Sequence, residues 1–258
     1  MLIVHSPSTK YYAEIIQSQK GGILYEVTSP PTIETLKILT IEKEIIAVGG
    51  GSVIDTAKII AIHSKAKVYA IPTTASGAAM TPWATIWNTE KISIPTQIPE
   101  LMNDYYGMSK FLPEKIRIST QYDCLSHMVE SWWSKNATLE SKQFITKATE
   151  FMQDYEEGND LNDLIDAGNC AGKAIAITQT NIIHALSYGL TIKYGLDHGS
   201  SCGVFFWPVV KQMNYLHWLP KIKPIEFDYD AKWIIDEALK YPKAENYLTR
   251  EELNDLLP

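Results

Sequence analysis

The first half of the chain alternates short apolar runs with stretches in which apolar residues recur at helical spacing. The expected strands are Leu2–Val4, Ile23–Val27, Ile45–Val48 and Val68–Pro72. The expected helices between them are Tyr11–Gln19, Ser29–Leu39 (with Pro30 and Pro31 at its start) and Val53–Ile62. Such an alternation predicts a parallel sheet with helices on its faces.

From about Pro113 onward the apolar spacing is helical and strand-like runs are scarce. The expected helices are Tyr122–Trp133, Thr138–Tyr155, Leu161–Ile177 and Ile182–Tyr194. Beyond Trp207, four prolines break the pattern into short pieces: Pro208, Pro220, Pro224 and Pro242. We therefore predict two domains, an α/β domain over residues 1–113 with a Rossmann-like parallel sheet and an all-helical domain over residues 114–258.

Two polar loops follow the ends of expected strands, where parallel sheets bind their ligands. The first consists of Gly49, Gly50, Gly51 and Ser52, with Asp55 one turn later. Its glycines would let backbone N–H groups approach a pyrophosphate at a helix N-terminus. The same residues also suit a tight turn in which Ser52 is a plain N-cap.

The second loop, Pro72–Gly77, contains three hydroxyl side chains, those of Thr73, Thr74 and Ser76. They could bind a phosphate or a ribose, or they could cap the next helix. Both loops are therefore candidates for a dinucleotide site, and neither motif proves one by itself.

A candidate metal site lies in the helical half. Asp123 and His127 are four residues apart, which places them one turn apart on one face of a helix. His184 and His198 could complete a set of one carboxylate and three imidazoles, which suits zinc, iron, nickel or copper. Single histidines are more often core or surface residues, so the hypothesis rests on the four together.

Composition narrows the classes of partner. The 258 residues are 45% apolar and 21% charged, with a formal net charge of −7. An acidic chain lacks the basic surface typical of nucleic-acid binding. It has no apolar stretch long enough to span a bilayer, no secretory leader, and three widely spaced cysteines. We expect a cytoplasmic protein with neither nucleic-acid nor membrane partners.

Taken together, these motifs resemble the iron-dependent (group III) alcohol dehydrogenases. Gly49–Lys58 is similar to the dinucleotide loop of that family and Pro72–Gly77 to its second nucleotide loop, while Asp123–Glu130 and His184–Gly199 resemble its two metal segments. The resemblance implies the iron alcohol dehydrogenase architecture, which dehydroquinate synthase shares. It also implies a divalent metal, Fe²⁺ or the compatible Zn²⁺, on Asp123, His127, His184 and His198 at the catalytic centre, and a nicotinamide dinucleotide.

Softer patterns resemble the phosphonoacetaldehyde reductase branch of this family, among them Trp83–Trp87, Ser131–Ala137 and His184–Thr191. A phosphonoacetaldehyde substrate would need cationic partners for its phosphonate. The candidates are Lys91, Arg117, Lys135 and Lys193, although each could be a plain surface charge. Trp87 is a candidate wall of the substrate pocket, and Lys91 is also a candidate cofactor contact.

Two departures from the family pattern affect the prediction. Members are usually longer, and here both the lead-in and the helical tail are shortened, which would leave apolar surface for a second copy to cover in a homodimer. NAD-selective members carry an acidic residue after the first strand, where this chain reads His5-Ser6-Pro7-Ser8. NAD or NADP therefore both stay open, with Ser6, Ser8 or Lys10 as contacts to a 2′-phosphate.

The expected activity is a metal-dependent, NAD(P)H-linked alcohol dehydrogenase or aldehyde reductase acting on a small alcohol or aldehyde. Reduction of phosphonoacetaldehyde to 2-hydroxyethylphosphonate is the specific expectation. The alternatives are a short-chain alcohol or lactaldehyde-type dehydrogenase, a dehydroquinate synthase-like lyase, and a non-catalytic remnant of the fold.

Overall fold

The first half of the protein is built on a five-stranded parallel sheet. In the computed structural model, which describes residues 1–102, 112–213, 220–245 and 247–257, the strand order is β2-β1-β3-β4-β7. The strands are β1 (Leu2–His5), β2 (Ile23–Glu26), β3 (Glu44–Gly49), β4 (Lys67–Pro72) and β7 (Glu100–Leu101). The four predicted strands are confirmed, and β7 is an addition.

Alternate residues of these strands serve opposite faces of the sheet, as the two-residue period requires. One face packs Val4, Ala47 and Val68 against α2 (Gly51–Ser64). The other face packs Ile3, Ile46 and Ile71 against α1 (Lys10–Lys20) and against Ile165 of α5 (Leu161–Thr178). Since both faces are covered, these strands read as continuous apolar runs.

The predicted helix Ser29–Leu39 is wrong. Only a 3₁₀ helix, Ile33–Lys37, forms in this stretch. A residue before proline disfavours helical backbone, so Pro30 and Pro31 keep the preceding chain extended. Leu39 is 73% exposed, so a longer helix would have had little core to pack against.

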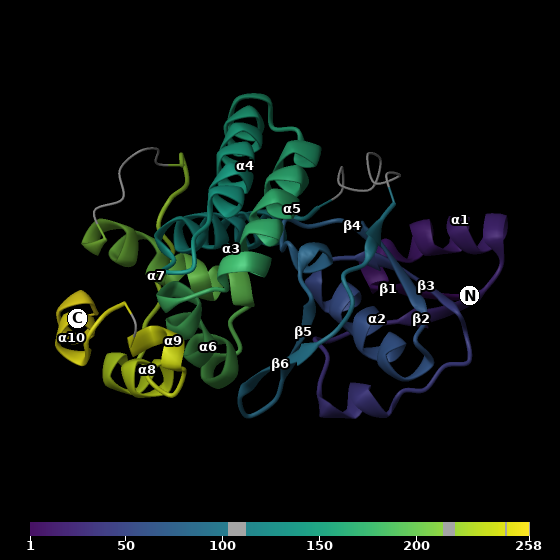
Figure 1. Ribbon diagram of the computed structural model, residues 1–258, viewed down its shortest axis with the longest axis horizontal. Coiled ribbons are helices and arrows are strands. Elements are labelled where there is room, and N and C mark those ends of the chain that lie inside the picture. Colours follow the sequence, from purple (N-terminus) through teal and green to yellow (C-terminus); the bar gives the residue numbers. More distant parts are fainter. Residues whose placement is uncertain (103–111, 214–219, 246, 258) are drawn as a thin grey trace.

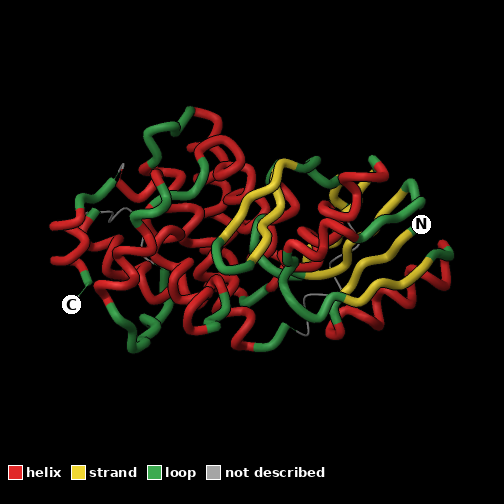
Figure 2. Tube along the Cα trace, turned by 90° about the horizontal axis from the view of Figure 1, so that it is seen from below, coloured by secondary structure: helices red, strands yellow, loops and turns green. Residues whose placement is uncertain are grey.

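An antiparallel hairpin, which the sequence analysis did not predict, follows the sheet. It pairs β5 (Trp83–Trp87) with β6 (Lys91–Pro95), and Trp87 stands opposite Lys91 at its tip. The hairpin extends away from the sheet toward the helical half (Figures 1 and 2). It therefore carries side chains of the first half to the second.

The second half is helical. Its longer helices are α3 (Glu114–Trp133), α4 (Leu139–Gly158), α5, α6 (Ile182–Tyr194) and α7 (His198–Gln212), and the shorter ones are α8 (Ala231–Ala238), α9 (Pro242–Glu245) and α10 (Arg250–Leu256). Short polar side chains cap several N-termini: Asp160 for α5, Asn181 for α6 and Asp197 for α7. Gly195, in the left-handed region at φ 68°, ends α6.

Two helices differ from the prediction. α3 begins at Glu114 rather than near Tyr122. The prediction missed the first turn of this helix because that turn is exposed and its apolar residues show no helical period. α7 was not predicted and continues through Pro208 to Gln212. Burial of Val209 and Val210 in the same core as Phe205 offsets the hydrogen bond that proline removes.

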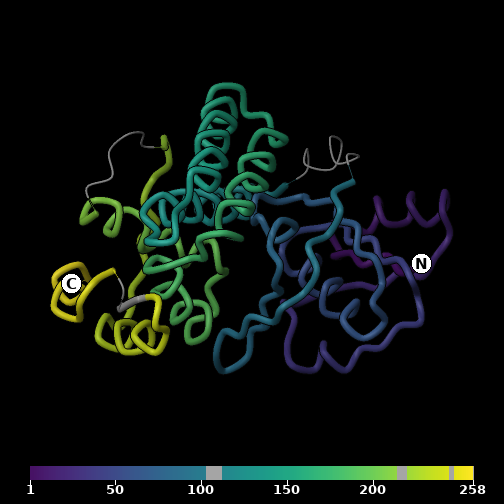
Figure 3. Tube along the Cα trace, viewed as in Figure 1, coloured from purple at the N-terminus to yellow at the C-terminus, as the bar shows by residue number. Residues whose placement is uncertain are grey.

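The sheet and the helices lie side by side along the long axis, with the two termini at opposite ends (Figure 3). The predicted α/β region followed by a helical region is thus confirmed. Within the described residues, no helix is both long and apolar enough to cross a membrane.

Candidate active site

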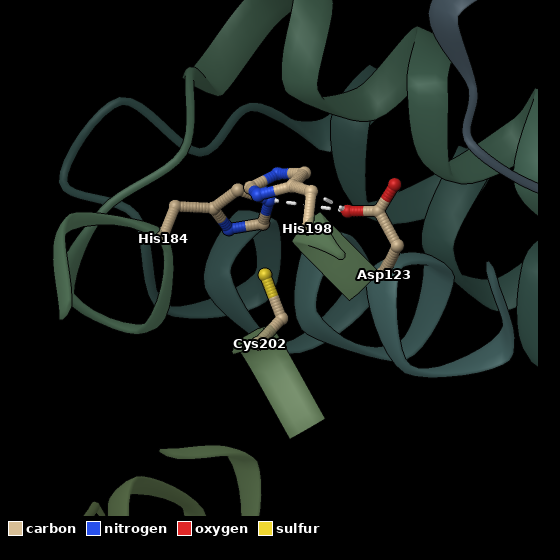
Figure 4. Close-up of side chains that lie close together, drawn as sticks. All are labelled: Asp123, His184, His198 and Cys202. Carbon is tan, nitrogen blue, oxygen red and sulfur yellow. Dashed lines mark ion pairs between the residues drawn. The ribbon is translucent and has the colours of Figure 1, made fainter. Parts of the chain in front are cut away.

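The four predicted metal ligands come from three helices that meet in the helical half. Asp123 and His127 lie on α3, His184 on the first turn of α6, and His198 is the first residue of α7. Figure 4 shows Asp123, His184 and His198 close together, with Cys202 beside them. Gly199 permits this meeting, because a Cβ there would lie only 2.0 Å from the Ser119 carbonyl oxygen of α3. The start of α7 can therefore approach α3 closely enough for their side chains to converge.

The four side chains converge on one carboxylate oxygen. Asp123 Oδ1 lies 3.5 Å from His127 Nε2, 3.4 Å from His184 Nε2 and 3.7 Å from His198 Nε2. Both Asp123 Oδ1 and His184 Nε2 are buried without a hydrogen-bond partner. Buried polar atoms seldom stay unpaired.

These spacings fit a bound cation. Tetrahedral ligands with metal bonds of the usual length lie about 3.4 Å from one another. The unpaired oxygen and the surrounding nitrogens are also the donor types that hold Zn²⁺ or Fe²⁺. The residues present therefore fit the metal that the sequence predicts.

Cys202, on the second turn of α7, offers a competing donor. The ligand atoms of Asp123, His184, His198 and Cys202 all lie within 4.8 Å of one another, and this group does not include His127. Burial, however, raises the pKa of the Cys202 thiol, and a protonated thiol is a poor ligand. We therefore favour His127, whose ring stacks on that of His184 with centroids 4.7 Å apart.

The electrostatics of Asp123, His127 and His198 suit cation binding. Burial lowers the pKa of His127 to about 4 and that of His198 to about 3, so both imidazoles are neutral near pH 7. Burial acts to raise the pKa of Asp123, but the neighbouring histidines outweigh it and hold that pKa below its usual range. A carboxylate and neutral imidazoles are the protonation states that metals require.

Glu130 also belongs to the site, although it was not among the predicted residues. Its fully buried carboxylate lies 2.6 Å from His184 Nδ1 and accepts the backbone N–H groups of His184 and Asn181. The contact orients the ring so that Nε2 faces Asp123. Burial acts to lower the pKa of His184, but the neighbouring Cys202 and Glu130 outweigh it and raise that pKa. The available signal was the helical spacing of Asp123, His127 and Glu130, which share one face of α3.

The two candidate nucleotide loops lie against each other. A Cβ on Gly50 would lie 3.0 Å from Thr74 Cγ2, and one on Gly51 would lie 3.2 Å from Ser76 Oγ. The first loop, Gly49–Ser52, leads from the carboxyl end of β3 into the start of α2. In the second loop, Thr73 comes directly after the end of β4. Glycine at these positions therefore brings backbone N–H groups and hydroxyls to one edge of the sheet.

The same edge contacts the helical half. Gly77, at φ +67°, would place a Cβ 2.8 Å from Gly172 Cα on α5. Ser6 follows the end of β1, and β1 pairs with β3, so Ser6 lies at the same edge of the sheet as the first loop. Its hydroxyl contacts the hydroxyls of Ser8 and Thr9. The loops thus lie where the sheet and the helices meet.

Asp55 makes a different contact from the one expected of a cofactor ligand. Its Oδ2 accepts the backbone N–H of Thr85 at 2.9 Å, and Oδ1 lies 3.6 Å from Lys58 Nζ. The fully buried Lys58 ammonium also donates to the carbonyl oxygens of Ala78 and Trp83. Asp55 and Lys58 therefore tie α2 to the start of the hairpin.

Of the substrate candidates, Trp87 and Lys91 reach the cluster. The Trp87 ring lies 5.2 Å from that of His198, and Lys91 Nζ lies 5.4 Å from the ring centroid of Tyr188 on α6. The hairpin tip thus forms one wall beside the histidines.

Three other candidates make contacts with different partners. Arg117 hydrogen-bonds the Tyr155 hydroxyl, Lys135 lies over the Tyr247 ring, and Lys193 lies 4.3 Å from the Trp233 ring centroid. None of these partners belongs to the histidine cluster, so the structure does not bring the three cations to it.

Comparison with known proteins agrees with the geometry. The iron-containing alcohol dehydrogenase family model matches residues 1–105, and the model of the C-terminal part of the Fe-containing alcohol dehydrogenase family matches residues 117–230. Together the two models cover most of the chain, with the C-terminal model following the first.

Curated relatives include a phosphonoacetaldehyde reductase from Streptomyces viridochromogenes, 29% identical over 75% of this chain and 59% of that protein. A 4-hydroxybutyrate dehydrogenase from Clostridium kluyveri is 28% identical over 83% of this chain and 64% of that protein. The chain thus spans less than two thirds of the length of these relatives.

Solved structures show the same fold. An iron-containing alcohol dehydrogenase from Thermotoga maritima superposes with a TM-score of 0.80 at 18% identity, covering 99% of this chain and 89% of that one. One from Corynebacterium glutamicum gives 0.81 at 17% identity, covering 99% and 86%. With both halves matched in sequence and the fold reproduced, the chain belongs to the iron-containing alcohol dehydrogenase family.

Proposed function

We propose that the protein is a metal-dependent, NAD(P)H-linked alcohol dehydrogenase that reduces a small aldehyde. The observation that carries the proposal is the convergence of three imidazole nitrogens on a buried, unpartnered oxygen of Asp123. This cluster lies beside a hairpin from the sheet half, whose loops are suited to a dinucleotide. Metal, cofactor and substrate would then meet at the junction of the two halves.

Asp123, His127, His184 and His198 would hold one divalent cation. Family membership favours Fe²⁺, and the donor set also suits Zn²⁺. Asp123 brings the negative charge, Glu130 fixes the orientation of His184, and the neutral rings of His127 and His198 keep the site's charge low. The pyrophosphate of the dinucleotide would lie on Gly49–Ser52, at the N-terminus of α2.

When bound, the cation supplies a Lewis acid for a carbonyl oxygen and NAD(P)H supplies the hydride. The chain's own task is to position the aldehyde and to exclude water. Trp87 and Tyr188 form aromatic walls beside His198, with ring centroids 5.2 and 6.1 Å from its ring. Both rings limit the space in which a substrate carbonyl can lie.

Two finer assignments follow from the relatives and the sequence. Phosphonoacetaldehyde is our first candidate substrate, supported by the 29% identical relative that carries its name, and short-chain aldehydes are the second. We infer that NADP(H) is accepted, because residues 6–10, which follow β1, contain no carboxylate to repel a 2′-phosphate.

The test is oxidation of NADH and NADPH by Fe²⁺-loaded protein with phosphonoacetaldehyde, propionaldehyde and lactaldehyde. We expect NADPH oxidation with at least one aldehyde, and a preference for phosphonoacetaldehyde would support the narrower assignment. Protein that contains metal yet oxidises neither cofactor with any aldehyde would contradict the proposal.

A further inference from the structure

Two lysines from distant parts of the chain converge on one buried tyrosine. Lys243, on α9, donates from Nζ to Tyr188 Oη at 2.6 Å and to Thr180 Oγ1 at 2.7 Å. Lys91, at the hairpin tip, places its Nζ 5.4 Å from the centroid of the same ring. Tyr188 itself is 1% exposed.

This group adjoins the candidate metal centre. Tyr188 lies one helical turn after His184 on α6, and its ring stacks on that of His198 at 6.1 Å with an interplanar angle of 24°. Trp87 closes another side, with its ring 5.9 Å from that of Tyr188. The lysines therefore lie about one aromatic side chain away from the proposed ligands.

Neither lysine forms an ion pair with a carboxylate anywhere in the described parts of the chain, although both are partly buried. The contrast is Lys58, which has Asp55 at 3.6 Å, and Lys240, which pairs with Glu237. Partly buried cations without a counterion are uncommon, since burial without a partner costs free energy. The arrangement leaves positive charge available at the edge of the site.

Both ammonium groups face Tyr188, Lys243 at its hydroxyl and Lys91 at its ring. Two positive charges directed at one point of the site create a potential that favours an anion placed there.

We propose that Lys243, with the hydroxyls of Thr180 and Tyr188 and facing Lys91, forms a subsite for an anionic group on the substrate. The preferred substrates would be aldehydes that carry a carboxylate, phosphate or phosphonate on a short carbon chain. This inference rests on the proposed aldehyde reductase function. It depends on Lys243 above all, because Lys91 is also a candidate contact for the cofactor.

The kinetic test compares two aldehydes of equal length, succinic semialdehyde and butyraldehyde, with wild type and Lys243→Met. We expect kcat/KM for the charged aldehyde to fall by about 30-fold or more, mostly through KM, and that for butyraldehyde to stay within about twofold. Lys232→Met, which removes an exposed lysine of α8, is the matched control and should change neither. Equal losses for both aldehydes, or no loss for the charged one, would overturn the subsite.

A binding test separates this inference from the proposed activity. Methylphosphonate is titrated calorimetrically into the protein, without cofactor or turnover. Wild type and Lys243→Arg should bind it, and Lys243→Met should bind it at least about tenfold more weakly while unfolding at a similar temperature. Absence of binding to wild type would overturn the subsite even if uncharged aldehydes are reduced. Binding without any aldehyde reduction would retain the subsite and contradict the proposed function.

Discussion

Asp55 and Asp123 are both largely buried carboxylates on helices, and each has a basic residue one turn later on the same helix. Asp55 Oδ2 accepts a backbone N–H, and its Lys58 partner donates to three oxygens in the segment before and at the start of β5. Asp123 Oδ1 instead has three imidazole nitrogens at 3.4 to 3.7 Å and no hydrogen-bond partner. The two pairs look alike in sequence, but protein groups hydrogen-bond to the first pair, whereas further histidines surround the carboxylate of the second.

The difference teaches how to separate structural from binding pairs. Asp55 Oδ1 also lacks a hydrogen bond, but the Lys58 ammonium lies 3.6 Å from it and itself donates to oxygens of the protein. The first pair therefore needs no ligand and stabilises the junction of α2 with the hairpin. The groups around Asp123 are oriented by the protein, through Glu130 and the packing of α3 with α7, but are not satisfied by it. An oriented, unsatisfied group is one that a ligand completes.

The largest expected effect comes from removing a ligand at the second pair. Asp123→Asn or His198→Ala should reduce bound metal from about one per chain to near zero and lower kcat/KM by about a thousandfold or more, since a Lewis acid contributes several kcal/mol. Metal analysis and aldehyde reduction measure both. The control is His63→Ala, an exposed histidine of α2, and a similar loss of metal there would contradict the assignment.

Substitutions in the pair of Asp55 and Lys58 should lower the free energy of unfolding and leave the metal content unchanged. Lys58→Met leaves Asp55 without its cation in a largely buried position, and we expect a loss of about 3–5 kcal/mol in the free energy of unfolding. Urea unfolding measures it. The double variant Asp55→Leu with Lys58→Met should recover much of that loss, and an undiminished loss would show that the pair does not act as a unit.

Glu130→Gln tests the contact that orients the metal ligand. It keeps the shape of the side chain but removes the charge that holds His184 Nδ1, so we expect metal affinity to fall by about 10- to 100-fold. Competition with a chelator gives the affinity. An unchanged affinity would mean that the carboxylate stabilises only the start of α6, through the N–H groups of Asn181 and His184.

The smallest expected effect concerns the cofactor. Ser6→Asp places a carboxylate after β1, where it would repel a 2′-phosphate, and we expect the ratio of NADH to NADPH use to rise by about tenfold. Thr146→Asp on the exposed face of α4 is the charge-matched control. If wild type already prefers NADH strongly, the inference about this segment fails.

Much of the fold could be predicted because burial leaves a clear pattern. The strands β1, β3 and β4 are covered on both faces and read as apolar runs. α4 buries one face, and α6 is buried over all of residues 182–190. Prediction failed where packing or local backbone chemistry overrode the pattern. The 3₁₀ helix at Ile33–Lys37 buries none of its residues, so little packing favours a longer helix there, and core packing carries α7 through Pro208.

The proposed metal ligands could be predicted from the sequence, but the residues that contact and orient them could not. The spacing of Asp123 and His127 indicated a shared face of α3, and the structure brings His184 and His198 to the same oxygen. Glu130 shares the face of α3 that carries Asp123 and His127, but its role depends on a contact with His184 more than 50 residues away in sequence. The contact of Lys243 with Tyr188 spans a similar separation. Such contacts depend on the tertiary arrangement and leave no local period.

The most direct test of the central assignment is X-ray absorption spectroscopy of the protein loaded with one equivalent of Zn²⁺. We predict a shell of nitrogen and oxygen ligands only, at about 2.0–2.2 Å, from Asp123 and the three histidines. A sulfur neighbour at about 2.3 Å would assign Cys202 in place of His127, and failure to retain the metal would contradict the site as a whole.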